Sequence, residues 1–323
     1  MDYSIKQTQL SKLEHFPIAF FAMVMGLTGL TLAWEKAAVI LGLPTIIGES
    51  LLYLSATAFL LVTLTYLLKA IRHRSAVLKE FNHPIKISFF PAFSISLILM
   101  SIATLGVSKT LSEYLWVLGV SLHLIFTLYV LGQWLHHPKF KIAHSTPAWF
   151  IPVVGNILVP IAGVQYGYNE ISWFFFSIGL IYWIILKTLI LNRMFFHDPL
   201  PEKLLPTLFI LIAPPAVGFI SYTQLTGGVD SFSRILFYSA MFLVLFLLSQ
   251  LPRFSRIQFF MSWWAYSFPL AASTVASFVM QQHNPSFSPI FSIALLCLSS
   301  GVITLLLFRT LLGITRGEIC RPE

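Results

Sequence analysis

The sequence predicts an all-α integral membrane protein, and three observations carry the prediction. Of the 323 residues, 57% are hydrophobic and only 10% are charged, whereas about a quarter of the residues are charged in ordinary soluble domains. The 30 phenylalanines are spread along the whole chain. The apolar residues are gathered in blocks that reach the roughly 20 residues needed for a membrane-spanning helix. A soluble fold cannot cover so much apolar surface with so few ions.

Ten apolar blocks have the length of a span. They lie at 16–34, 45–68, 87–107, 113–135, 147–166, 171–191, 203–223, 232–250, 257–280 and 288–308. The block at 203–223 is the weakest, because three prolines interrupt it. The first block ends in LAWE, without the small-residue pattern of a signal-peptide cleavage site, so we interpret it as a permanent helix. We therefore expect a cytoplasmic segment at 1–15, a ten-helix domain at 16–312 and a cytoplasmic tail at 313–323.

Lysine and arginine are distributed unevenly between the two sides of the predicted bundle. Seventeen of the 20 basic residues lie in the termini and in alternate loops. The opposite loops hold only Lys36, Lys109 and Arg234. Because basic loops stay in the cytoplasm, this asymmetry predicts that both termini are cytoplasmic. The net charge of +8 does not indicate nucleic-acid binding, since the basic residues are sparse and apolar blocks separate them.

Helix-breaking residues alternate between the predicted spans. Prolines lie within the third, fifth, seventh and ninth spans and two glycines lie near the middle of the first, whereas the second, fourth, sixth and eighth spans have no interior proline. The odd-numbered spans begin roughly 60 residues apart, which indicates a helical hairpin repeated five times.

A proline leaves the carbonyl four residues earlier without its hydrogen bond, so Pro160 would free the carbonyl of Asn156 and Pro269 that of Ala265. In lipid such a group costs several kcal/mol unless protein or water satisfies it. We therefore expect the kinked odd helices on the inside and the straight even helices around them. The alternative is that the prolines only shape helix packing.

The predicted spans lack the residues that ion-coupled or enzymatic chemistry needs. No Asp, Glu, Lys or Arg lies near the centre of any span, which disfavours a proton-driven pump. His123 is the one histidine near mid-bilayer, and we expect a hydrogen-bonded packing residue rather than a haem ligand. His136, His137 and His144 lie in a basic loop, where solvation is favoured over weak metal binding.

The sequence contains no HExxH, GxSxG or P-loop pattern, and its two cysteines form no metal-spaced cluster. We therefore expect no catalytic residue, no metal and no cofactor. What remains is a neutral conduit with a basic cytoplasmic rim, which would favour anions by its long-range field and bind them weakly enough for conduction.

Several short motifs together resemble one known family. They are FAMVMGL at 21–27, LAW at 32–34, HP at 83–84, SFF at 88–90, VVGN at 153–156, AP at 213–214, SY at 221–222 and WWAYSFP at 263–269. Over about residues 16–312 the chain resembles the tellurite-resistance/dicarboxylate transporter family, which includes bacterial TehA and the slow-type anion channels of plant guard cells. The plant channels carry long phosphorylated tails, so kinase gating of that type is not expected for the short tails here.

The resemblance implies a homotrimer in the bilayer of a bacterial inner membrane. Each protomer would hold ten helices as five hairpins in a quasi-five-fold arrangement, with the odd helices lining a central pore. The phenylalanine that plugs the pore corresponds to Phe268, and Pro269 beside it would give the ring room to swing. As residues along the pore we take Gly26, Pro91, Asn156, Pro160, Pro214 and Ala272.

The sequence therefore favours a passive channel for small inorganic anions such as chloride and nitrate, closed by Phe268. Two alternatives stay open. One is a carrier of malate-like dicarboxylates or a tellurite exporter of the same family. The other is a membrane enzyme or electron-transfer subunit, which the missing catalytic motifs and haem-ligand histidines disfavour.

Overall fold

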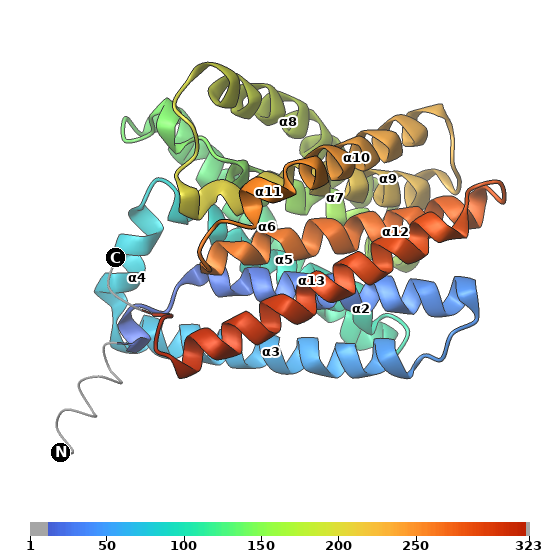
Figure 1. Ribbon diagram of the computed structural model, residues 1–323, viewed down its shortest axis with the longest axis horizontal. Coiled ribbons are helices and arrows are strands. Elements are labelled where there is room, and N and C mark those ends of the chain that lie inside the picture. Colours follow the sequence, from blue (N-terminus) through green and yellow to red (C-terminus); the bar gives the residue numbers. More distant parts are fainter. Residues whose placement is uncertain (1–11, 321–323) are drawn as a thin grey trace.

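The computed structural model describes residues 12–320, and among them it contains helices and no β-strand (Figure 1). The predicted all-α fold is therefore confirmed for this range. Residues 1–11 and 321–323, which belong to the predicted terminal segments 1–15 and 313–323, lie outside the described residues. The last helix ends at Thr315, inside the segment predicted as a tail.

Long helices alternate with short connections. The α-helices are α2 (Phe21–Leu41), α3 (Ile46–Arg72), α4 (Arg74–Asn82), α5 (Pro91–Thr104), α6 (Lys109–His136), α7 (Ile151–Gly163), α8 (Asn169–Phe196), α9 (Ala213–Thr226), α10 (Ser231–Ser249), α11 (Leu251–Phe254), α12 (Ser267–His283) and α13 (Pro289–Thr315). One end of the bundle holds α4 and the start of α2, and we call it the α4 end (Figure 1). The other, the short-loop end, holds the connections at 42–45, 105–108, 167–168, 227–230 and 284–288.

Nine helical segments within residues 12–320 are long and apolar enough to cross a membrane. They coincide with nine of the ten predicted blocks. The remaining block, 257–280, is divided between a 3-10 helix, η7 (Met261–Tyr266), and α12, whose 17 residues fall short of a full span on their own. The chain is therefore a multi-pass membrane protein.

The spans fall into two classes by burial. We compare the buried share of the most apolar 18-residue stretch in each span. This share is 67–89% for the spans that contain α2, α5, α7 and α9. It is only 17–39% for α3, α6, α8, α10 and α13. Nearly all residues of α12 up to Met280 are buried, so α12 belongs to the first class. We call the first class the inner helices and the second the outer helices. The inner helices correspond to the odd predicted spans.

The inner helices contact one another in a closed cycle. Helix α2 packs against α5, α5 against α7, α7 against α9, α9 against α12, and α12 against α2. Each inner helix also packs against the outer helix that follows it in the chain. The outer helices in the same order are α3, α6, α8, α10 and α13.

A 3-10 helix precedes every inner helix at the α4 end. These segments are η1 (Ile18–Phe20), η2 (Lys86–Phe89), η4 (Pro147–Phe150), η6 (Glu202–Ile212) and η7. Pro91, Pro152 and Pro214 lie in the first turns of α5, α7 and α9, where the missing N–H has no helical partner to lose. The structure thus corrects the expectation that these prolines kink helix interiors, whereas Pro160 does lie inside α7.

Candidate functional site

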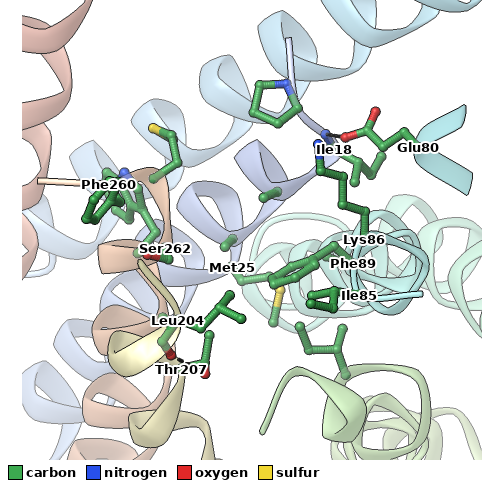
Figure 2. A pocket seen from close by; sticks show the side chains of 18 of the residues that line it. Ile18, Met25, Glu80, Ile85, Lys86, Phe89, Leu204, Thr207, Phe260 and Ser262 are labelled. Atoms are coloured by element: carbon green, nitrogen blue, oxygen red, sulfur yellow. Dashed lines mark hydrogen bonds between the residues drawn. The ribbon is translucent and has the colours of Figure 1, made fainter. Parts of the chain in front are cut away.

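A cavity of about 850 Å³ extends from the α4 end into the cycle of inner helices (Figure 2). Every inner helix contributes to its wall: Met25 from α2, Ile95 from α5, Leu158 from α7, Ala213 from α9 and Phe268 from α12. None of these side chains is charged. The wall therefore has no fixed charge that would hold an ion tightly.

Charged side chains line the cavity only at its entrance. They are Glu14, Lys69, Lys79, Glu80, Lys86, Lys203 and Glu318. Among the described residues these are four lysines and three glutamates, of which Lys69 and Glu80 form a buried pair. Burial raises the pKa of the Cys320 thiol, which also lines the entrance, to about 11, so this thiol adds no negative charge at neutral pH.

Phe268 lies at the deep end of the cavity, in the first turn of α12, and is 8% exposed. Its ring faces Gly29, one turn beyond Met25 on α2. A Cβ atom at Gly29 would lie 3.2 Å from Cδ2 of Phe268 and 3.1 Å from the Cβ atom of Ala271. The absence of a side chain at Gly29 thus lets α2 approach the phenyl ring closely.

The other residues predicted along the pore do not line this cavity. They are Gly26, Pro91, Asn156, Pro160, Pro214 and Ala272. Gly26 lies against α12, where a Cβ atom would overlap the side chain of Ser267. Asn156 points toward α6, and its Nδ2 donates to Thr127 Oγ1 at 3.1 Å and to the carbonyl of Val153 at 3.0 Å. Gly26 and Asn156 therefore shape contacts between helices, and Ala272 lies one turn beyond Phe268, past the deep end.

Side chains of the outer helix α6 satisfy carbonyls of the proline-containing helix α7. Thr127 Oγ1 donates to the carbonyl of Pro152 at 2.7 Å, and Trp116 Nε1 donates to the carbonyl of Val159 at 3.0 Å. These bonds come from protein rather than water, as burial in a membrane requires. Neither carbonyl is the one that Pro160 leaves without its helical partner, which belongs to Asn156, so these bonds join α6 to α7 in addition to the helical hydrogen bonds.

His123 of α6 is a hydrogen-bonded packing residue, as expected from the sequence. It is fully buried, and its Nδ1 lies 2.8 Å from Ser94 Oγ on α5. Its ring occupies the space that a side chain at Gly155 of α7 would need. Because Gly155 lines the cavity, His123 supports the wall from behind and joins α6 to two inner helices.

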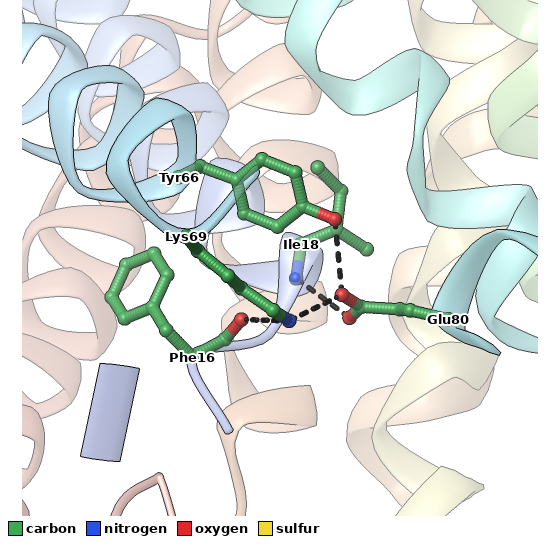
Figure 3. Close-up of polar contacts among 5 residues, drawn as sticks. All are labelled: Phe16, Ile18, Tyr66, Lys69 and Glu80. Atoms are coloured by element: carbon green, nitrogen blue, oxygen red, sulfur yellow. Dashed lines mark hydrogen bonds and ion pairs between the residues drawn. The ribbon is translucent and has the colours of Figure 1, made fainter. Parts of the chain in front are cut away.

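The structure contains a buried ion pair at the entrance that the sequence analysis did not anticipate (Figure 3). Lys69 Nζ lies 2.8 Å from Glu80 Oε2, and the two side chains are only 3% and 6% exposed. Glu80 also accepts hydrogen bonds from Tyr66 Oη at 3.0 Å and from the backbone N–H of Ile18 at 2.9 Å. Lys69 donates a further bond to the carbonyl of Phe16 at 2.8 Å. This network ties α3, α4 and the start of α2 together.

One signal in the sequence points to this pair. Glu80 is the single acidic residue in a loop region that holds Lys69, Arg72, Arg74, Lys79 and Lys86. A lone acid among bases is a candidate for burial with a partner, because a buried charge needs one.

Within residues 12–320, no group of three or more His, Cys, Asp or Glu side chains could hold a metal ion.

Comparison with known proteins gives a consistent result. Residues 15–311 match the family described as voltage-dependent anion channel. The S-type anion channel SLAH3 of Arabidopsis thaliana is 29% identical over 272 residues, which cover 82% of this chain and 43% of that protein. The guard cell S-type anion channel SLAC1 of the same plant is 26% identical over 318 residues, 95% of this chain and 57% of that protein.

A bacterial relative is covered almost completely. The tellurite resistance protein TehA homolog of Haemophilus influenzae is 24% identical over 304 residues, 94% of this chain and 92% of that protein. The chain therefore spans about half the length of the plant relatives and nearly all of this bacterial one.

Proposed function

Because the chain belongs to the voltage-dependent anion channel family, we propose that it is a passive channel for small monovalent anions such as chloride and nitrate. Membership in this family confirms the resemblance found in the motifs. The observation that carries the proposal is the cavity to which every inner helix contributes uncharged side chains, with Phe268 among them. The plant relatives are anion channels by name. The chain is accordingly a transport protein rather than an enzyme.

The proposed pore runs along the axis of the inner helices, with ten membrane-crossing segments arranged as five hairpins in quasi-five-fold order. The closed cycle of inner-helix contacts and the burial of α12 support this arrangement. The segment η7 with α12 serves as the ninth span, because together they cover the length that α12 alone lacks.

Conduction in this pore depends on attraction at the entrance and weak binding inside it. The basic loops at the α4 end concentrate anions near the entrance. Beyond the entrance the apolar wall offers no ion pair, so an anion leaves as readily as it arrives.

Phe268 is the proposed gate. An aromatic ring across a narrow apolar path excludes water, and a dewetted constriction stops ions without any charge. Pro269 follows the ring in the first turn of α12 and has no backbone N–H, so no donor of its own ties this turn to the preceding η7 beside the gate. Gly29 provides the flat surface against which the ring closes.

The proposed setting is a bacterial inner membrane, with the α4 end and both termini in the cytoplasm. The basic residues support this orientation, because the loops at the α4 end hold most of them. The proposed assembly is a homotrimer in which each protomer keeps its own pore. Large exposed hydrophobic side chains on the outer helices, such as Ile71, Leu135 and Ile290, suit contact with lipid and with neighbouring protomers.

The Phe268→Ala variant tests the proposal. Removal of the ring should convert a protein with little current into one with large ohmic anion currents in planar bilayers. Reversal potentials with nitrate and chloride then give the selectivity. Phe278→Ala is the matched control, because Phe278 is a buried phenylalanine of the same helix that packs with Ala33 and Ala37 away from the cavity.

A folded Phe268→Ala protein that carries no more current than the Phe278→Ala control would contradict the channel. Saturable, proton-dependent malate uptake without current would support the dicarboxylate carrier instead.

A further inference from the structure

The helix faces that line the cavity continue past Phe268 toward the short-loop end. On α2, Met25 lines the cavity, and Gly29, Leu32 and Lys36 follow it at intervals of four, three and four residues. This spacing keeps the residues on one face of an α-helix. Since Gly29 of this face lies against Phe268, Lys36 lies on the same face beyond the gate.

Helix α12 repeats the pattern. Phe268 is followed at intervals of four, three, four and three residues by Ala272, Val275, Val279 and Gln282. Gln282 is therefore the last residue of the face that carries the gate. It lies at the short-loop end, one residue before the helix ends.

A glutamine also ends this face on α9 and on the 3-10 helix η5 (Val164–Tyr166), which continues α7. Three and seven residues after cavity-lining Leu158 come Ile161 and Gln165. Three helical turns after cavity-lining Ala213 comes Gln224. The fifth inner helix, α5, ends at Thr104 and contributes no long polar side chain there.

On the helix faces that carry these residues, some side chains keep part of their surface exposed. Ile161 is the one residue of α7 that is not buried, and Val275 is the one residue of α12 before Gln281 that is not buried. Leu32 of α2 and Ile102 of α5 are likewise only partly buried. Because the rest of these helix segments is largely enclosed by protein, we infer that this shared face borders solvent beyond Phe268.

The four polar residues at the ends of these faces form two hydrogen-bonded pairs between neighbouring inner helices. Lys36 Nζ donates to Gln282 Oε1 at 2.7 Å, joining α2 to α12. Gln165 Nε2 donates to Gln224 Oε1 at 3.2 Å, joining η5, at the end of α7, to α9. The adjacent Glu35 packs against Gly48 of α3. Within residues 12–320 the only ion pair is the one at the opposite end, so Lys36 has no carboxylate partner.

We propose that Lys36, Gln165, Gln224 and Gln282, here called the collar, form a binding site for monovalent anions such as chloride, bromide and nitrate at the short-loop end of the pore. The inference rests on the proposed function. In each pair one amide oxygen already accepts a hydrogen bond, while an ammonium with three N–H groups and amide N–H groups remain to donate. One uncompensated positive charge attracts an anion without trapping it.

The test uses the Phe268→Ala background, in which the gate is absent. Lys36→Gln should lower the unitary anion conductance at low salt by roughly threefold or more, and the difference should shrink at high salt because ions screen the charge. Lys36→Arg should retain the parental conductance. Lys109→Gln is the matched control, because Lys109 lies at the same end but on the outer helix α6; it should leave the conductance unchanged.

Equal conductances for Lys36→Gln and Lys109→Gln at low salt would overturn the collar, whereas the absence of any Phe268→Ala current would contradict the channel itself. A second measurement does not depend on current. Crystals soaked in bromide should give an anomalous-scattering peak within hydrogen-bond distance of Lys36 Nζ. Loss of this peak in Lys36→Gln crystals supports the collar, and its absence from the parental crystals overturns it.

Discussion

The inner and outer helices of this protein are similarly apolar, yet they are built differently. The α-helical parts of the inner helices are 13–21 residues long and each follows a 3-10 segment. The outer helices run for 19–28 residues without an interior break. Hydropathy therefore identifies a membrane helix, whereas the position of its prolines and 3-10 turns identifies which helices face the interior.

The difference has a physical cause. A helix against lipid must satisfy every backbone group by itself, because hydrocarbon offers no partner. The backbone carbonyls of an inner helix can also accept hydrogen bonds from side chains of neighbouring helices, as those of α7 do from Trp116 and Thr127 of α6. Variants at three places test this difference between the two classes, beginning with the ion pair that joins them.

The largest effect on stability is expected at the ion pair that joins outer α3 and α4 to the start of inner α2. Glu80→Ala should lower the free energy of unfolding by about 3–5 kcal/mol, because it leaves the Lys69 ammonium buried without its partner. Thermal unfolding in detergent measures the loss.

The double variant Lys69→Met/Glu80→Leu should recover much of that loss, since it removes both charges and retains apolar volume. Lys79→Ala, an exposed neighbour on α4, serves as the control. If Glu80→Ala and Lys79→Ala unfold at the same temperature, the network does not hold the two classes together.

A smaller effect is expected from adding a methyl group to a glycine of each class. Gly155→Ala on inner α7 should cost roughly 1–3 kcal/mol, because the ring of His123 fills the site and must move. Gly301→Ala on outer α13 meets open space and should stabilise the helix by about 0.5–1 kcal/mol. Unfolding of both variants under one condition measures the contrast. The two variants should shift the free energy of unfolding in opposite directions, and two neutral variants would refute the contrast.

The smallest effect is expected at the start of outer α10, which Asp230 caps, whereas the inner helices have no side-chain cap. The hydrogen bond from the backbone N–H of Ser233, together with that from Tyr222 Oη, lowers the pKa of Asp230. A lowered pKa in the folded state means that the stabilisation is present above about pH 4 and is lost as the pH falls through the folded value.

Asp230→Asn keeps a hydrogen-bond acceptor and removes the charge. The stability of this variant should therefore not fall with pH in the way expected for the wild type. Unfolding midpoints measured across the acid range compare the two proteins. Parallel pH profiles for the wild type and Asp230→Asn would show that the carboxylate charge contributes nothing at this helix end.

Much of the architecture could be predicted from the sequence because its causes are local. Apolar length gives the span limits, and the spacing of prolines separates the inner from the outer helices. The lone mid-membrane histidine, His123, was correctly interpreted as a packing residue. The family resemblance was needed to single out Phe268, since one phenylalanine among 30 has no local mark.

What the sequence could not supply was the direction in which individual side chains point. Asn156 was expected along the pore but faces Thr127, because the register between α6 and α7 decides its partner. Glu80 lies among several basic residues in the sequence, so its partner could not be chosen from the sequence. The turn between α3 and α4 brings Lys69 to it. The glutamines of the proposed collar resemble ordinary span boundaries until their spacing from the cavity-lining residues is considered.

The cycle of inner helices closes between α2 and α12, where Gly26 lies against Ser267. These are the first and the last inner helices to leave the ribosome. During biosynthesis the glycine face of α2 must therefore enter the membrane long before its partner exists, so the translocon or early neighbours have to shield it. In a nascent chain halted before α12 the cycle of inner helices is still open, so the insertion of α12 is the step that closes it.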